Sequence, residues 1–341
     1  MPSKKKGMFV LKIALSLALL AVLTWFVDPH QMLHSMAGAE QSLLMLALAM
    51  AIVNRILMAI KWNILLRAID VAISYGVAVT TYFASTFAGI FLPPTIGGDA
   101  VRTYMLAGKY SRTVEVISSI LIERVIGLLV LAAFGLIGVA VLLVLFSAQF
   151  PAASKLAWVI GGSAVFLFGA TGFITTPAFS RFVKYVIDKI ENRGKLAARS
   201  ANLLRKIHAS CLVYKDRPVA ILTFLALTIV ENLLVVIRAW IVTIAFGIDI
   251  GILLFFIVVP IEQFLIRLPI SFDGFGIREG IFLYALSAMG VPAATALAIG
   301  LTNHLLFILA VTPGAWFLLS VKYSDRRVTD GDNPADPTSK S

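Results

Sequence analysis

Long runs of apolar residues divide the chain into segments. Six of them, at about 8–27, 43–66, 116–146, 156–176, 219–246 and 294–321, are long enough for an α-helix to cross roughly 30 Å of hydrocarbon. Two more runs, 77–92 and 252–268, are shorter, and each leads into a Pro/Gly-rich polar stretch and a second short apolar piece. Irregular backbone at membrane depth needs protein or water to satisfy its polar groups. The pattern predicts an all-α polytopic membrane protein with about six transmembrane helices and two re-entrant helical hairpins.

Composition agrees with this interpretation. Hydrophobic residues make up 60% of the 341 positions and charged residues only 14%, whereas soluble domains hold about 45–50% and 25%. The single cysteine, Cys211, excludes an intramolecular disulfide and a cysteine-based metal site. The chain has no P-loop, dinucleotide fingerprint, nucleophile elbow or zinc-protease helix. We therefore expect no cofactor, no metal ion and no catalytic residue, and a protein that is not an enzyme.

The net charge of +11 is explained by the positive-inside rule rather than by nucleic-acid binding. If the N-terminus is cytoplasmic and both hairpins return to the side they entered from, the external loops 28–42, 147–155, 247–251 and 288–293 hold one basic residue, Lys155. Eight full spans would instead place Lys109 and Arg112 outside. The charge pattern favours the hairpins, with both termini in the cytoplasm, and a bacterial inner membrane is the expected location.

Residues 1–321 are predicted to form one transmembrane domain, followed by a tail, 322–341, rich in Asp, Pro, Gly and Ser that we expect to be disordered and cytoplasmic. The sizeable polar loop is 178–218. Apolar residues recur there at three- and four-residue spacing with basic residues between them. The loop is expected to be a cytoplasmic amphipathic linker, lying against anionic lipid or docking a partner.

An internal duplication links the two irregular stretches. Residues 92–102 read LPPTIGGDAVR and residues 268–278 read LPISFDGFGIR, so Arg102 and Arg278 correspond at an offset of 176 residues. The preceding helices repeat at an offset of 177, with Lys61 matching Arg238. Repeat one covers about 43–176 and repeat two about 219–321. One hairpin would enter from the cytoplasm and the other from outside, so the halves form an inverted-topology repeat, as in many secondary transporters.

The hairpin tips are the candidate site. Glycines let backbone approach a ligand, helix ends direct N–H groups at it, and arginines suit phosphate. The predicted substrate-binding residues are Thr95, Gly97, Gly98, Asp99, Arg102, Glu123, Arg124, Ser271, Asp273, Gly274, Gly276, Arg278 and Glu279. Arg102 and Arg278 either bind substrate or pair internally with nearby carboxylates, because charges inside a membrane are usually paired or face a cavity.

Other charged residues also interrupt the apolar runs. Glu231 and Glu262 are candidate carboxylates for coupling transport to protons, although a buried ion pair is the simpler interpretation of each. Lys61 and Arg238 lie near predicted span ends, where long side chains extend to the interface. His304 stands alone in the last predicted span, where a hydrogen-bonded helix contact is more common than a proton relay.

The motifs resemble a known family. Gly98-Asp99-x-x-Arg102 followed by Ile122-Glu123-Arg124, and Gly274-x-Gly276-Ile277-Arg278-Glu279, are similar to the two signatures of the lysylphosphatidylglycerol synthase transmembrane family. The resemblance extends from about residue 8 to 321. Asp273 stands where that pattern leads us to expect glycine.

The resemblance implies lipid flipping. In that family the membrane region is regarded as the part that moves aminoacylated phosphatidylglycerol between leaflets, while a soluble C-terminal domain makes the lipid. This chain ends about 20 residues after its last predicted span, so we do not expect it to transfer lysine by itself.

Three functions remain open. The first is a transporter that moves a polar or phosphate-bearing lipid through a central cavity at the hairpin tips, and the lipid is either aminoacylated or not. The second is a non-catalytic subunit that assists a lipid- or glycan-modifying enzyme, and the third is a membrane transferase acting on a lipid-linked substrate. The expected partners are the membrane and a phospholipid or lipid-linked substrate, with a lipid-modifying enzyme or a second copy of the chain as further candidates. Nucleic acid is not expected.

Overall fold

The structure is a computed structural model of the whole chain. It describes residues 28–92, 97–110, 112–145, 176–191, 195–267, 271 and 273–320, with isolated positions between 158 and 169. The predicted first span 8–27, most of the predicted span 156–176 and the tail 322–341 lie outside the described residues, as does Thr95.

Four predicted spans are confirmed as long apolar helices. These are α3 (Gln41–Ala68), α6 (Thr113–Leu145), α10 (Pro218–Ala245) and α13 (Ala293–Val311), which continues as helix to Ser320. Each is long and apolar enough to cross a membrane. The described part of the chain contains helices and turns and no strand, so the all-α polytopic fold is confirmed.

Pairs of short helices occupy the two irregular stretches. The first pair is α4 (Tyr75–Phe91) and α5 (Gly97–Tyr110), and the second is α11 (Phe255–Leu265), preceded by the turn η2 (Ile252–Leu254), and α12 (Ile277–Ala288). In the first pair, a Cβ placed on Gly98 would lie 3.0 Å from the carbonyl oxygen of Ser85, so glycine permits the tight contact of α5 with α4. The helical hairpins are therefore present, and their re-entrance into the membrane stays a prediction.

The two halves have the same order of helices: a long helix, two short ones and another long one. The leading helices, α3 and α10, pack side by side. Lys61 contacts Thr228 and Glu231, whereas the earlier residue Ala51 lines a cavity with the later residue Arg238. The two helices are therefore antiparallel. If both helices cross the membrane, they cross it in opposite directions, as an inverted-topology repeat requires.

Each half also packs a short helix on the long helix of the other half. A Cβ on Gly138 of α6 would lie 2.3 Å from the carbonyl oxygen of Phe256 in α11, and a Cβ on Gly314 in the continuation of α13 would lie 2.2 Å from that of Phe83 in α4. Gly138 and Gly314 are 176 residues apart in the sequence, which is the offset of the two motifs. This reciprocal packing supports the predicted duplication.

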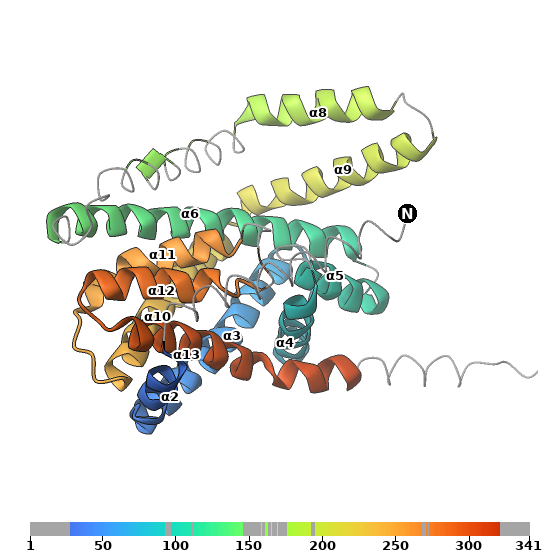
Figure 1. Cartoon of the computed structure of the whole chain (residues 1–341). Coiled ribbons are helices and arrows are strands. Elements are labelled where there is room, and N and C mark those ends of the chain that lie inside the picture. Colours follow the sequence, from blue (N-terminus) through green and yellow to red (C-terminus); the bar gives the residue numbers. More distant parts are fainter. Residues whose placement is uncertain are drawn as a thin grey trace, which may run out of the picture.

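The remaining helices lie at the periphery (Figure 1). The short α2 (Pro29–Ala37) packs on α13, while α8 (Pro177–Glu191) and α9 (Lys195–Val213), followed by the turn η1 (Tyr214–Asp216), form a hairpin on the far side of α6. Helix α9 packs on α6 and α8 packs on α9, while Phe182 and Tyr185 of α8 are exposed. The segment 178–218 is thus two helices, and its cytoplasmic location stays a prediction.

Candidate functional site

Arg102 is at the centre of the first charged cluster. It projects from α5, is 3% exposed, and lies 2.8 Å from Glu123 of α6 and 3.0 Å from Asp99 one turn earlier. The contact with Glu123 is an ion pair whose N–H is not aligned for a hydrogen bond. Arg124 donates from Nε and Nη2 to Oδ2 of Asp99, at 3.1 and 2.8 Å. Asp99 is therefore held between two arginines, and Arg102 has two carboxylate partners.

Aromatic rings complete the surroundings of Arg102. Its guanidinium carbon lies 4.4 Å from the ring centre of Trp62 and 4.9 Å from that of Tyr82. The Tyr82 hydroxyl donates to Glu123 at 3.1 Å, and the Trp62 indole donates to Ser119 at 3.0 Å. Cation–π contacts of this kind stabilise an arginine most where water is excluded, so Trp62 of α3 and Tyr82 of α4 stabilise Arg102 in its buried position.

The second cluster surrounds Arg278 at the start of α12. Arg278 is 8% exposed, and its Nη1 donates to Glu262 of α11 at 2.8 Å while its Nε donates to the backbone oxygen of Asp273. Its guanidinium carbon lies 5.1 Å from the ring of Phe307 in α13. The tip arginines are thus both paired internally, which is the structural alternative that the sequence left open.

A histidine lies between two carboxylates beside Arg278. His304, fully buried in α13, has Nδ1 at 2.8 Å from Glu279 and Nε2 at 3.3 Å from Asp273. Glu279 also accepts the N–H of Gly276 at 2.7 Å, which caps α12. His304 therefore connects the two carboxylates of the second tip from α13. The sequence placed His304 alone because the chain gives no sign that α13 packs against α12.

The backbone explains the residues at the second tip. Asp273 has φ 47, followed by Gly274 at φ 79 and Gly276 at φ 82. Left-handed backbone favours glycine and is tolerated by Asp, which accounts for an aspartate where a glycine is expected. Ser271 is buried beside it, 2% exposed. At the first tip, Gly97 begins α5, and Gly98, the counterpart of Gly274 at the offset of 176, is the close-contact glycine described above.

A third cluster lies on the α3–α10 contact. Lys61 is 3% exposed and forms an ion pair with Glu231 and a 3.2 Å hydrogen bond to Thr228. Arg238 is 9% exposed. The expectation that Lys61 and Arg238 extend to the interface is wrong, because both side chains are directed into the helix contact. Glu231 and Glu262, the candidate coupling carboxylates, are each in an ion pair.

Helix α3 contacts both clusters. Its Trp62 lies under Arg102, while its Arg55 shares the ring of Phe307 with Arg278, at 5.2 and 5.1 Å from the ring centre. Both motifs therefore lie beside α3, although no direct contact between Arg102 and Arg278 is seen among the described residues.

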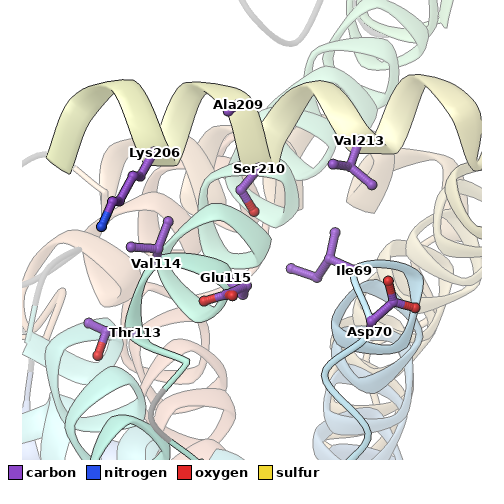
Figure 2. Close-up of a pocket in the computed structure, with 9 residues that line it drawn as sticks. All are labelled: Ile69, Asp70, Thr113, Val114, Glu115, Lys206, Ala209, Ser210 and Val213. Carbon is purple, nitrogen blue, oxygen red and sulfur yellow. The ribbon is translucent and has the colours of Figure 1, made fainter. Parts of the chain in front are cut away.

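A larger cavity lies away from these clusters. It measures about 690 Å³ and opens between α9, the start of α6 and the end of α3 (Figure 2). Asp70, Glu115 and Lys206 are its charged lining residues. Buried arginines are absent from it, so the charged clusters are the stronger candidate for headgroup chemistry. Within the described residues, no group of three or more His, Cys, Asp or Glu side chains is arranged to hold a metal ion.

Comparison with known proteins agrees with the motifs. The family model described as "Lysylphosphatidylglycerol synthase TM region" matches residues 9–314. A "UPF0104 membrane protein" of Methanothermobacter thermautotrophicus is 21% identical over 318 residues, which cover 89% of this chain and 91% of the relative. Four helices that can cross a membrane and a match over most of the chain lead to one conclusion. This multi-pass membrane protein belongs to the lysylphosphatidylglycerol synthase transmembrane-region family.

Proposed function

We propose that the protein moves a polar, phosphate-bearing lipid between the leaflets of a bacterial inner membrane, with both termini in the cytoplasm. The lipid passes between the two hairpins, and its headgroup exchanges with the ion pairs at their tips. No covalent chemistry is assigned to the chain.

The observation that carries the proposal is the pair of buried arginine clusters on two oppositely directed halves. Arg102 and Arg278 hold matching places in those halves, and each is paired with carboxylates on a neighbouring helix. Buried ion pairs add little net stability, whereas pairs that open when an anionic headgroup arrives give a lipid a path through the apolar interior.

Lipid movement in proteoliposomes tests this function. The protein is reconstituted with headgroup-labelled phosphatidylglycerol or lysylphosphatidylglycerol, and loss of label from the outer leaflet is followed with and without a proton gradient. Wild type is expected to move label, and Arg102→Ala and Arg278→Ala are expected to reduce movement to background while remaining folded. Arg112→Ala is the matched control, because Arg112 is 52% exposed and pairs only with Glu115 among the described residues.

The result that contradicts the proposal is wild-type protein that moves no lipid under either condition. Such a result favours the non-catalytic subunit, which is then tested by co-purification with a lipid-modifying enzyme.

A further inference from the structure

The duplication predicts a second ion pair that is not formed among the residues the structure describes. The offset of 177 residues maps Lys61 onto Arg238 and maps Asn54 onto Glu231. Lys61 and Glu231 form a buried ion pair between α3 and α10. A two-fold relation between these helices places Arg238 opposite Asn54 in the equivalent position. Because Asn54 is neutral, the negative charge of this second pair is missing.

Arg238 is bonded to a backbone oxygen instead. It is 9% exposed, and Nη1 donates to the backbone oxygen of Asn303 at 3.2 Å. No Asp or Glu lies within ion-pair distance of it in the part of the chain that the structure describes. A buried guanidinium with only a carbonyl partner carries a positive charge that an incoming anion can compensate.

The side chains around Arg238 are also smaller than those around Lys61. Lys61 is held by the Thr228 hydroxyl at 3.2 Å and lies 4.9 Å from the ring of Phe224. The positions that correspond to Thr228 and Phe224 at the same offset are Ala51 and Ala47. A cavity of about 10 Å³ is found there, lined by Ala51, Asn54, Arg55, Arg238 and Phe307 among others. Its volume is close to that needed for one water molecule.

A second cation lines this cavity. Arg55 donates to Oδ1 of Asn54 at 3.2 Å, and its guanidinium carbon lies 5.2 Å from the ring of Phe307. No carboxylate lies within ion-pair distance of Arg55 among the described residues. Two guanidinium groups therefore converge, from α3 and from α10, on one polar gap inside an apolar helix contact.

We propose that Arg238 and Arg55 form the binding site for a phosphate oxyanion, at the position where the repeat lacks its carboxylate. The inference rests on the proposed lipid translocation. It adds the place where the headgroup phosphate is held, which is the contact of α3 with α10. Arginine binds phosphate through paired N–H donors. Among the described residues Arg55 is held by the amide oxygen of Asn54 and the ring face of Phe307 and by no carboxylate. The gap of about 10 Å³ admits the group only after this side chain shifts. Arg102 and Arg278 must first release a carboxylate when the headgroup reaches them, whereas Arg238 and Arg55 have no carboxylate within ion-pair distance among the described residues.

The sharpest test restores the missing carboxylate. Asn54→Glu is expected to pair with Arg238 and close the site. Full-length protein in detergent is mixed with phosphatidylglycerol, with phosphatidylcholine or with inorganic phosphate, and binding is measured by native mass spectrometry and by the rise in Tm. Asn54→Glu is expected to raise the Tm without lipid and to weaken phosphatidylglycerol binding at least about tenfold, as loss of one charge-assisted contact does.

Matched variants separate binding from folding. Arg238→Gln and Arg55→Gln are expected to weaken binding by a similar factor without raising the Tm. Arg112→Ala, at a position that is 52% exposed and outside the site, keeps wild-type binding. Glu231→Gln breaks the Lys61–Glu231 pair farther along the α3–α10 contact and is expected to lower the Tm with phosphatidylglycerol binding retained.

The outcomes distinguish the sources of the anion and the two proposals. Binding of inorganic phosphate without phosphatidylglycerol supports the site and assigns it to a free ion. Phosphatidylglycerol binding that Asn54→Glu and Arg238→Gln both leave unchanged overturns the site, even if lipid movement is seen. Binding that these variants abolish, in a protein that moves no lipid, supports the site and overturns the transport function instead.

Discussion

Arg102 and Glu123 lie 2.8 Å apart across the contact of α5 with α6, one 3% and the other 10% exposed at the side chain. Removing one member of a buried pair leaves the other charge without compensation. Glu123→Gln is therefore expected to cost about 3 kcal/mol, at the low end for such a loss because Arg102 keeps Asp99. The free energy of unfolding in mixed micelles, from titration with sodium dodecyl sulfate, measures this.

A double variant checks that the cost arises from the pair. Arg102→Gln combined with Glu123→Gln is expected to cost clearly less than the sum of the two single changes, because the second removes a charge that the first left uncompensated. Costs that simply add show that the two residues act separately.

Gly138 provides a test of the reciprocal packing. Gly138→Ala places a Cβ 2.3 Å from the carbonyl oxygen of Phe256, so α6 and α11 must separate, at a cost of about 2 kcal/mol. Gly127→Ala, in the same helix with nothing within 4 Å of the added atom, is expected to be neutral or to stabilise by up to about 1 kcal/mol. Equal effects in thermal unfolding contradict the close contact of α6 and α11.

Membrane topology follows from the hairpin assignment. Cysteines introduced at Arg112, before α6, and at Ala293, at the start of α13, are expected to react from opposite sides of the membrane, with Arg112 cytoplasmic. The background is Cys211→Ser, because Cys211 is the single native cysteine. A membrane-impermeant maleimide applied to right-side-out and inverted vesicles measures this. Reaction of both positions from one side contradicts the inverted repeat.

Cys211 in α9 is itself a test of the peripheral helices. Burial raises the pKa of its thiol above the usual value, so the thiolate fraction is low at neutral pH and increases with pH through an unusually alkaline range. The control is Leu203→Cys in the Cys211→Ser background, because position 203 is 44% exposed. The rate of maleimide labelling of Cys211 is expected to keep rising to a higher pH than that of the control. Identical pH profiles show that Cys211 is not buried against α6.

Much of the fold is predictable because membrane spans are encoded locally. Helices α3, α6, α10 and α13 begin and end within three residues of the apolar runs, apart from the last turns of α13. The two hairpins were predictable from Pro and Gly in otherwise apolar stretches. The duplication was visible because Arg102 and Arg278 stand in similar motifs.

Partners of individual charges were not predictable, since they depend on helix contacts that sequence spacing does not encode. Lys61 is near a span end and could extend to the interface, yet α10 supplies Glu231 and the lysine is buried. Glu279 and His304 are 25 residues apart and meet only because α12 packs on α13. Asp273 was an anomaly in the motif, and its left-handed backbone conformation explains it.

The reciprocal glycine contacts also constrain how the protein is made. Phe83 belongs to a helix synthesised early, while Gly314, which packs on its carbonyl group, leaves the ribosome more than 200 residues later. The first half therefore enters the bilayer with an uncovered backbone surface, and it matures only after nearly the whole chain has been translated. The order of synthesis thereby makes the two halves obligate partners during biogenesis, and a chain cut in the 178–218 segment must recover its missing half from a co-expressed fragment.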